Sequence, residues 1–295
     1  MSGILKGPNG LRAGWRLLIY AALVFALGYT EGKIENAVSH GQQQDLASPT
    51  QAALIMSVFC FIILLAAWVM ARIEGRSLAD YGLPWRRALC KQFWQAGALG
   101  FVSLTLLLAV LWVARAYSPG SLQLHGLQIW TNAFFWTLAI IVAAVLEEFF
   151  YRGYLQFTLT TGIGFWPAAF VTSTLMGAAH AFNPGWTVLG LFTVFGFGLI
   201  ACFLLRRTGD LWTPIGLHAG WNFGEVYFYG VPSSGQMGHG HLLQGSLHGP
   251  DWLTGMPFGV EAGWPNVVLF LIWWFLFAKW FRDVKYPKPD AEVRP

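Results

Sequence analysis

The chain has 295 residues, of which 56% are hydrophobic and 11% are charged. Soluble domains carry charge at about 25% of positions, so the composition excludes an ordinary soluble domain and indicates a protein embedded in lipid. The net charge of +4 comes from basic residues scattered over short connections, which excludes a nucleic-acid-binding stripe. The three cysteines show no CxxC spacing, so neither a disulfide framework nor a cysteine metal site is predicted.

Apolar runs near twenty residues long predict about eight transmembrane helices. In chain order they lie near residues 14–30, 52–71, 93–114, 130–151, 165–182, 186–205, 214–230 and 264–281. These runs are about twice as long as a barrel strand, and open sheet edges cannot exist in hydrocarbon. The predicted fold class is therefore all-α and polytopic, with a single membrane domain filling residues 1–295 and no internal repeat.

Basic residues occupy every second connection between these runs. They are Lys6, Arg12, Arg16, Arg72, Arg76, Arg86, Arg87, Lys91, Arg152, Arg206, Arg207, Lys279, Arg282, Lys285 and Lys288. The positive-inside rule then predicts that these connections and both termini are cytoplasmic. The first run follows three basic residues, as in a signal peptide, but its length favours a retained helix. The Gly/His-rich connection at 232–263 shows no periodicity and is predicted to be irregular.

The stretch LEEFFYRG, residues 146–153, places two carboxylates and a guanidinium at the end of the fourth run. Ionisable side chains at membrane depth cost about 2.5 to 3.5 kcal/mol each, so each needs a reason. Glu148 and Arg152 are four residues apart and share a helix face, whereas Glu147 points about 100° away. This spacing predicts a structural Glu148–Arg152 pair and leaves Glu147 for chemistry as a general base. The alternative is an interfacial charge cluster that caps the helix end.

His180 lies among small residues in the fifth run, within STLMGAAHAFNPG. A histidine in an apolar span either packs against a neighbouring helix or takes part in a site. Glu147 and His180 would lie at equal depth on adjacent helices if the chain reversed near residues 163 and 164. Thr160–Gly164, TTGIG, is the turn-like stretch at that point, so equal depth is expected.

His218 and Asn222 in GLHAGWNF are also four residues apart and share a face of the seventh run. Counting from Pro214 at about 1.5 Å per residue, His218 lies within roughly 10 Å of the cytoplasmic end of its helix. Glu147 and His180 reach a similar level only if the stretch GYLQFTLTTGIG projects beyond the bilayer. We therefore expect a site near the cytoplasmic side, open to the cytosol.

A carboxylate, two imidazoles and an amide suit hydrolysis of an amide bond. The carboxylate and one histidine activate and hold water, and the second histidine and the asparagine donate hydrogen bonds to the oxyanion. Glu147, His180 and His218 would also satisfy a catalytic zinc with water in the fourth position. HExxH is absent, so the residues leave metal-free and zinc-assisted hydrolysis open.

Two other features have alternative interpretations. Glu225 lies seven residues after His218 and either faces the same cavity or is a hydrogen-bonded packing acid. His239, His241 and His248 either bind a metal or belong to an ordinary polar loop.

The three motifs resemble those of the CPBP family, the CAAX-protease and bacteriocin-processing (Abi) intramembrane endopeptidases, which include the type II CAAX prenyl endopeptidases. The family pattern is EExxxR, FxxxH and then HxxxN or HxxxD, and the chain has EEFFYR, MGAAH and HAGWN in that order. Met176 stands where the family usually has Phe. The motifs cover residues 146–223, within an expected catalytic core at 130–230.

The resemblance implies roles for these residues. It implies Glu147 as the water-activating base, His180 as its partner, His218 and Asn222 at the oxyanion, and Glu148 with Arg152 in support. It also implies substrates that are membrane-anchored, such as prenylated CaaX peptides, and it leaves open a metal-free glutamate or a zinc mechanism. The alternative functions are those of a non-catalytic scaffold or bacteriocin-immunity protein of the same fold, and of a proton-coupled carrier that uses Glu147 and His180. The absence of two repeated halves with broken helices argues against the carrier.

Overall fold

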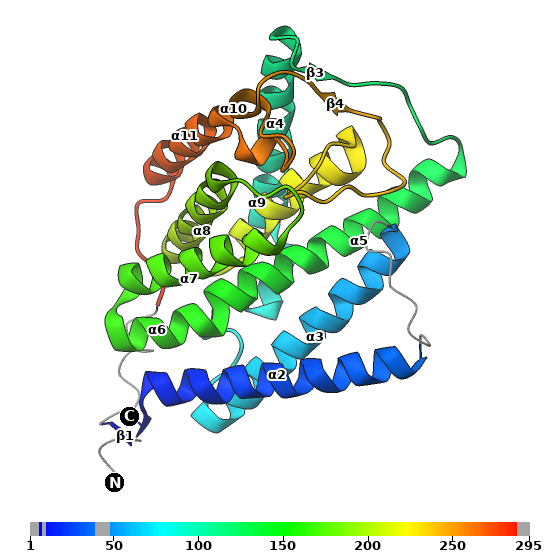
Figure 1. The fold of residues 1–295 in the computed structure, drawn as a ribbon. Coiled ribbons are helices and arrows are strands. Elements are labelled where there is room, and N and C mark those ends of the chain that lie inside the picture. The colour runs from blue at the N-terminus through cyan, green and yellow to red at the C-terminus, as the bar shows by residue number, and fades with distance from the viewer. Residues whose placement is uncertain (1–5, 8–9, 39–47, 288–295) are drawn as a thin grey trace.

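The computed structural model describes residues 6–7, 10–38 and 48–287, and it forms a bundle of helices (Figure 1). The helices are α2 (Ala13–Val38), α3 (Pro49–Glu74), α4 (Lys91–Val113), α5 (Leu127–Phe149), α6 (Gln156–Ile163), α7 (Phe165–Ala179), α8 (Val188–Thr208), α9 (Trp212–Asn222), α10 (Asp251–Thr254) and α11 (Trp264–Trp280). Short helical turns are η1 (Trp85–Arg87), η2 (Phe150–Leu155), η3 (His180–Phe182), η4 (Phe223–Tyr229) and η5 (Val260–Ala262). Within the described residues the strands are two-residue pairs, β1 (Lys6–Gly7) with β2 (Gly10–Leu11) and β3 (Tyr117–Ser118) with β4 (Ser246–Leu247). The all-α class is confirmed.

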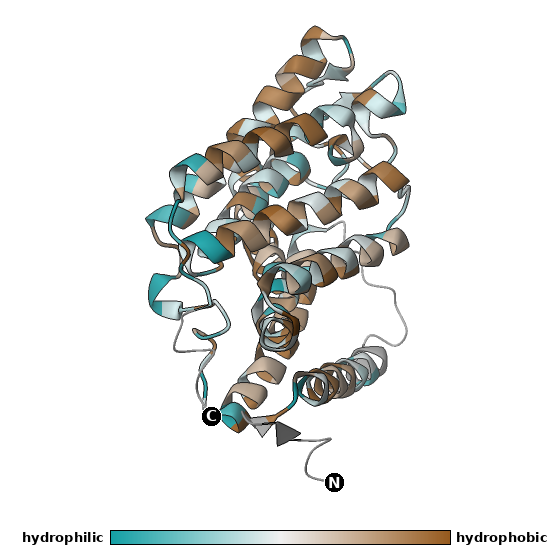
Figure 2. Cartoon of the chain, turned by 90° about the vertical axis from the view of Figure 1, so that its left-hand side faces the viewer, coloured by the Kyte–Doolittle hydropathy of each residue, from teal (hydrophilic) through white to brown (hydrophobic). Residues whose placement is uncertain are grey.

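The helices carry the apolar surface that a bilayer requires. In the described residues, five helices are long and apolar enough to cross a membrane, at 13–33, 49–74, 91–113, 127–163 and 188–208. The other three expected spans are shorter helices, α7 with 15 residues, α9 with 11 and α11 with 17. Figure 2 shows apolar residues along the helices and polar residues concentrated at their ends and in the connections. The chain is an integral membrane protein.

The region after Glu148 differs from the expected span boundary near residue 151. α5 continues through the π-helical turn η2 into α6, so the helical run extends from Leu127 to Ile163. Gly153 has φ −84° and ψ −112°, which kinks the run without ending it. The chain then reverses at Gly164, whose φ of 84° is accessible to glycine. The predicted reversal is confirmed, and the stretch before it is a helix.

α4 and α9 approach each other through glycines. A Cβ on Gly220 would lie 1.9 Å from the carbonyl oxygen of Gly97, and one on Gly216 would lie 2.2 Å from that of Phe93. A Cβ on Gly100 would lie 2.3 Å from the carbonyl oxygen of Leu217. Small residues four apart allow this backbone contact in membrane helices. The packing fixes the helix that carries His218 and Asn222.

At one end of the bundle, charged and phenolic side chains from different helices form hydrogen bonds with one another. The Arg16 guanidinium donates to the Glu74 carboxylate, with Nε 2.8 Å from Oε1. The hydroxyl groups of Tyr81 and Tyr154 donate to the same carboxylate, at 3.0 Å and 2.5 Å. The basic connections between α3 and α4 and between α8 and α9 lie at this end. Lys288, which the sequence analysis included among the basic residues, lies outside the described residues.

The 232–263 connection covers the opposite end. It is mostly irregular, as predicted, and contains β4, α10 and η5. Asn183 Nδ2 donates to the carbonyl oxygen of Ser234 at 2.9 Å, and Trp136 Nε1 donates to that of His239 at 2.9 Å. These bonds hold the connection against α5 and against the end of α7.

Candidate active site

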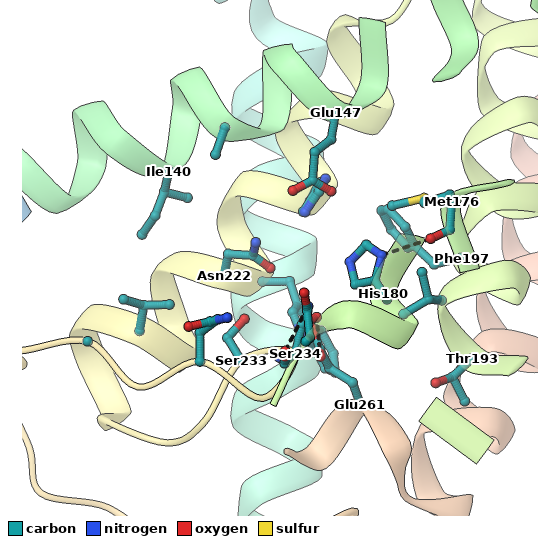
Figure 3. A pocket seen from close by; sticks show the side chains of 18 of the residues that line it. Ile140, Glu147, Met176, His180, Thr193, Phe197, Asn222, Ser233, Ser234 and Glu261 are labelled. Atoms are coloured by element: carbon teal, nitrogen blue, oxygen red, sulfur yellow. Dashed lines mark hydrogen bonds between the residues drawn. The ribbon is translucent and has the colours of Figure 1, made fainter. Parts of the chain in front are cut away.

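A cavity of about 360 Å³ lies among the helices and is closed in part by the 232–263 connection. Glu147, His180, His218 and Asn222 all line it. They come from α5, η3 and α9, so three separate segments bring the four predicted residues to one space. Much of the remaining wall is apolar, with Ile140, Met176, Val194, Phe197, Phe270 and Trp273. Figure 3 shows the labelled residues around this space.

The side chains of Glu147 and Glu148 point in different directions, because adjacent residues on an α-helix lie about 100° apart around its axis. Glu147 is half-buried and its carboxylate extends from α5 into the cavity (Figure 3). Glu148 is wholly buried and faces the protein interior. The two carboxylates therefore occupy different environments, one open to a bound molecule and one enclosed by protein.

Glu148 joins two partners. Its Oε2 lies 3.5 Å from Arg152 Nη1, with both side chains fully buried, as the four-residue spacing predicted. Its Oε1 accepts from His218 Nδ1 at 3.0 Å. The second contact comes from a helix 70 residues further along the chain and was not anticipated. Glu148 thus links the buried guanidinium to one of the two cavity histidines.

The hydrogen bonds of the histidines fix which ring nitrogen carries a proton. His180 Nδ1 lies 2.9 Å from the carbonyl oxygen of Met176, and a carbonyl can only accept. Nδ1 is therefore the donor, and in the neutral ring Nε2 is left as an acceptor. His218 Nδ1 donates to Glu148 by the same argument, so its Nε2 is available to the cavity.

Met176 occupies the position where the resembling family has Phe. Its side chain is 2% exposed and lines the cavity. Its Sδ accepts a hydrogen bond from Arg152 Nη2 at 2.9 Å, while its carbonyl accepts from His180. The residue therefore contacts both the supporting arginine and the cavity histidine, which a phenylalanine side chain could not do through sulfur.

Sequence reasoning missed the polar residues that the connection and α11 add to the cavity. They are Ser233, Ser234, Gln236, Glu261 and Asn266, together with Asn183 after η3. Asn266 and Glu261 lie outside the expected core at 130–230. The available signal was Glu261 itself, an acid standing immediately before an apolar run, in GVEAGWPN. Glu225, by contrast, is fully buried and is not part of the cavity wall.

The arrangement of the donor groups bears on whether the site could hold zinc. In the described part of the chain, no three His, Cys, Asp or Glu side chains are gathered closely enough to hold a metal ion. This applies to Glu147, His180 and His218 around the cavity, and also to His239, His241 and His248 in the connection. The residues do not fit a bound zinc, so no step of the reaction is assigned to a metal.

Comparison with known proteins supports the resemblance. Residues 129–224 match the family model described as type II CAAX prenyl endopeptidase Rce1-like. No curated protein and no solved structure matches the chain. The matched segment includes Glu147, Glu148, Arg152, His180, His218 and Asn222. The match supports a membrane endopeptidase and a lipid environment.

Proposed function

We propose that the protein is an intramembrane endopeptidase that hydrolyses peptide bonds of membrane-anchored proteins or peptides, including prenylated, CaaX-like ones. The main support for this proposal is that one cavity is lined by four polar residues from three separate segments. They are Glu147, His180, His218 and Asn222. These side chains can provide a general base, a group that binds the water molecule, and hydrogen-bond donors for the oxyanion, in a cavity whose wall is mostly apolar. The segment that matches the Rce1-like family contains all four.

The reaction begins with a water molecule between Glu147 and His180. Glu147 removes a proton from the water, and His180 Nε2, an acceptor in the neutral ring, holds the water's second hydrogen. The water oxygen attacks the carbonyl carbon, and the negative charge moves to the carbonyl oxygen. Asn222 Nδ2 and His218 Nε2 donate hydrogen bonds to this oxyanion.

Donation by His218 requires a proton on both ring nitrogens, since Nδ1 already donates to Glu148. The ring is then positively charged, and the Glu148 carboxylate balances that charge. Arg152 in turn holds Glu148 in place. The buried pair is thus a positioning device for the oxyanion donor.

Cleavage of a peptide tethered in liposomes tests the proposal. Wild-type protein is expected to cleave at least one member of a panel that includes a farnesylated CaaX peptide. Glu147→Gln is expected to lower the rate about 10²- to 10⁴-fold, because the amide has similar shape but cannot remove a proton. Product is measured by mass spectrometry.

Glu31→Gln on α2, which is outside the cavity wall, serves as the matched control and should keep wild-type activity. A scaffold would show no product with either protein while its cellular function survived Glu147→Gln. Proton-gradient-dependent uptake without a cleaved product would favour the carrier.

The residues that line the cavity also indicate from which side of the membrane a substrate would enter it. The sequence predicted a site near the cytoplasmic side, whereas Ser233, Gln236, Met237 and Glu261 belong to the connection opposite the basic end. With both termini cytoplasmic, as the basic residues suggest, the exposure of the cavity-lining Met237 favours an opening towards the extracytoplasmic face, beside the part of the connection that covers the cavity. We take that opening as part of the proposal.

Cysteine labelling in intact cells checks the opening. Met237 is 45% exposed and lines the cavity, so Met237→Cys is expected to react with a membrane-impermeant maleimide. Arg86→Cys, at an exposed position of the basic end, should react after the cells are lysed. Both variants carry Cys90→Ser, because Cys90 is half-buried while Cys60 and Cys202 are buried. The reverse labelling pattern would restore the cytoplasmic opening.

A further inference from the structure

A second carboxylate faces the cavity opposite Glu147. Glu261 lies in η5, immediately before α11, and lines the same cavity. In Figure 3 Glu147 extends from α5 on one side, Glu261 extends from the opposite side, and Asn222 and His180 lie between them. Glu261 also lies outside the segment that matches the Rce1-like family.

One oxygen of Glu261 is held as a hydrogen-bond acceptor. Oε2 accepts from the backbone nitrogen of Ser234 at 2.7 Å and from its Oγ at 2.8 Å. Ser234 has a φ of 47°, and Asn183 fixes its carbonyl. A carboxylic acid whose carbonyl oxygen is occupied in this way presents its second oxygen, Oε1, as the hydroxyl donor.

The surroundings favour the protonated acid. Burial raises the pKa of Glu261, and this effect exceeds the opposing influence of the Ser234 hydrogen bonds and of His180 and His218. Glu225, fully buried on η4, lies near enough to Glu261 for the two carboxyl groups to interact electrostatically. The raised pKa of Glu261 lets this acid keep its proton to a higher pH than an exposed glutamate does.

We propose that Glu261 is the proton donor to the leaving amine in the hydrolysis proposed above. This inference rests on the proposed function and adds a second catalytic residue to it. An amide nitrogen must be protonated as its bond to carbon breaks, since an amide anion is a poor leaving group. Glu147 and Glu261 lie on opposite sides of the cavity (Figure 3), so a peptide bond between them would have the base on one side and the proton donor on the other.

The protons balance over one turnover. The water oxygen forms a bond to the carbonyl carbon and gives one proton to Glu147. The carbon–nitrogen bond then breaks, and the nitrogen takes the proton of Glu261 and leaves as the amine. The carboxyl product departs, and water carries the proton from Glu147 back to Glu261. The net reaction is amide plus water giving acid plus amine.

A pair of tethered substrates tests the donor role. One has the scissile peptide bond, and the other has a 4-nitrophenyl ester at the same carbonyl, whose leaving group needs no proton. Glu261→Gln is expected to lower kcat for the peptide about 10²-fold or more and to change ester hydrolysis less than about threefold. Glu147→Gln should impair both substrates, because both need activated water.

The pH profile gives an independent measurement. Peptide hydrolysis by the wild type should fall as pH rises through the raised pKa of Glu261, because the acid then loses its proton. Ester hydrolysis should lack this alkaline fall. Glu225→Gln, which keeps the side-chain shape and leaves Glu261 in place, should retain the alkaline fall, whereas Glu261→Gln should lose it.

The outcomes separate the two proposals. Equal losses on peptide and ester in Glu261→Gln would overturn the donor role and indicate that Glu261 only orders the Ser234 turn. Unchanged peptide hydrolysis would overturn it as well. A wild-type protein that cleaves neither substrate would overturn the proposed endopeptidase and with it this inference.

Discussion

Gly220→Ala is expected to prevent α9 from packing against α4 and so to abolish both the folded protein and its hydrolytic activity. The added Cβ would lie 1.9 Å from the carbonyl oxygen of Gly97, a backbone atom that cannot rotate away. Overpacking of this kind costs about 1 to 3 kcal/mol where side chains can move, and more where they cannot. The helix that is displaced carries His218 and Asn222, so any protein that still folds should have misplaced oxyanion donors.

Thermal unfolding in detergent, followed by tryptophan fluorescence, measures the loss. Gly28→Ala on α2 is the matched control, because a Cβ there would have no atom of another part of the described structure within 4 Å. It should unfold at or slightly above the wild-type temperature, since alanine favours the helix over glycine. Equal unfolding temperatures for the two variants would show that the α4–α9 contact can relax.

The approach of Glu147 and His180 could be predicted from the sequence because it depends only on how many residues separate each of them from the turn between their helices. A helical reversal at Gly164 places residues that are equally distant from it at one depth, and the glycine signal is local. The spacing of Glu148 and Arg152 is local in the same sense. Each of these predictions needed only the helical repeat and one turn.

The contact between Glu148 and His218 could not be predicted in this way. The residues are 70 positions apart, and their approach depends on how α9 rotates and packs within the bundle. That rotation is set by Gly216 and Gly220 against α4, a contact between backbones that side-chain patterns do not specify. The sequence therefore indicated the ion pair of Glu148 with Arg152, but not the hydrogen bond that joins Glu148 to the cavity residue His218.

Glu261 was missed for a different reason. The connection at 232–263 has neither the helical nor the strand repeat, so its sequence gives no position for any side chain. Its path depends on individual bonds, such as that from Asn183 to Ser234, and on the two hydrogen bonds from Ser234 to Glu261. Glu261 stands out in the sequence as an acid before an apolar run, but its position in the cavity follows from the fold.

Glu148→Gln is expected to destabilise the protein by about 3 to 5 kcal/mol, because it leaves the buried charge of Arg152 without a counterion. Arg152 is 0% exposed, and among the described residues its Nε and Nη1 have no hydrogen-bond partner. Glu148→Gln with Arg152→Met removes both charges and should recover much of this stability, because Met is of similar length and suits an apolar interior. Thermal unfolding of the two variants and the wild type provides the comparison.

Activity should not recover with stability in the double variant. The amide that Glu148→Gln introduces would still accept a hydrogen bond from His218 Nδ1, but it could not balance the positive charge that His218 needs in order to donate to the oxyanion. Peptide cleavage is therefore expected to remain low in a protein that is folded again. Recovery of cleavage together with stability would show that His218 acts as a neutral ring and that Glu148 is needed only for the arginine. A double variant no more stable than Glu148→Gln would instead show that the ion pair is not what stabilises this region.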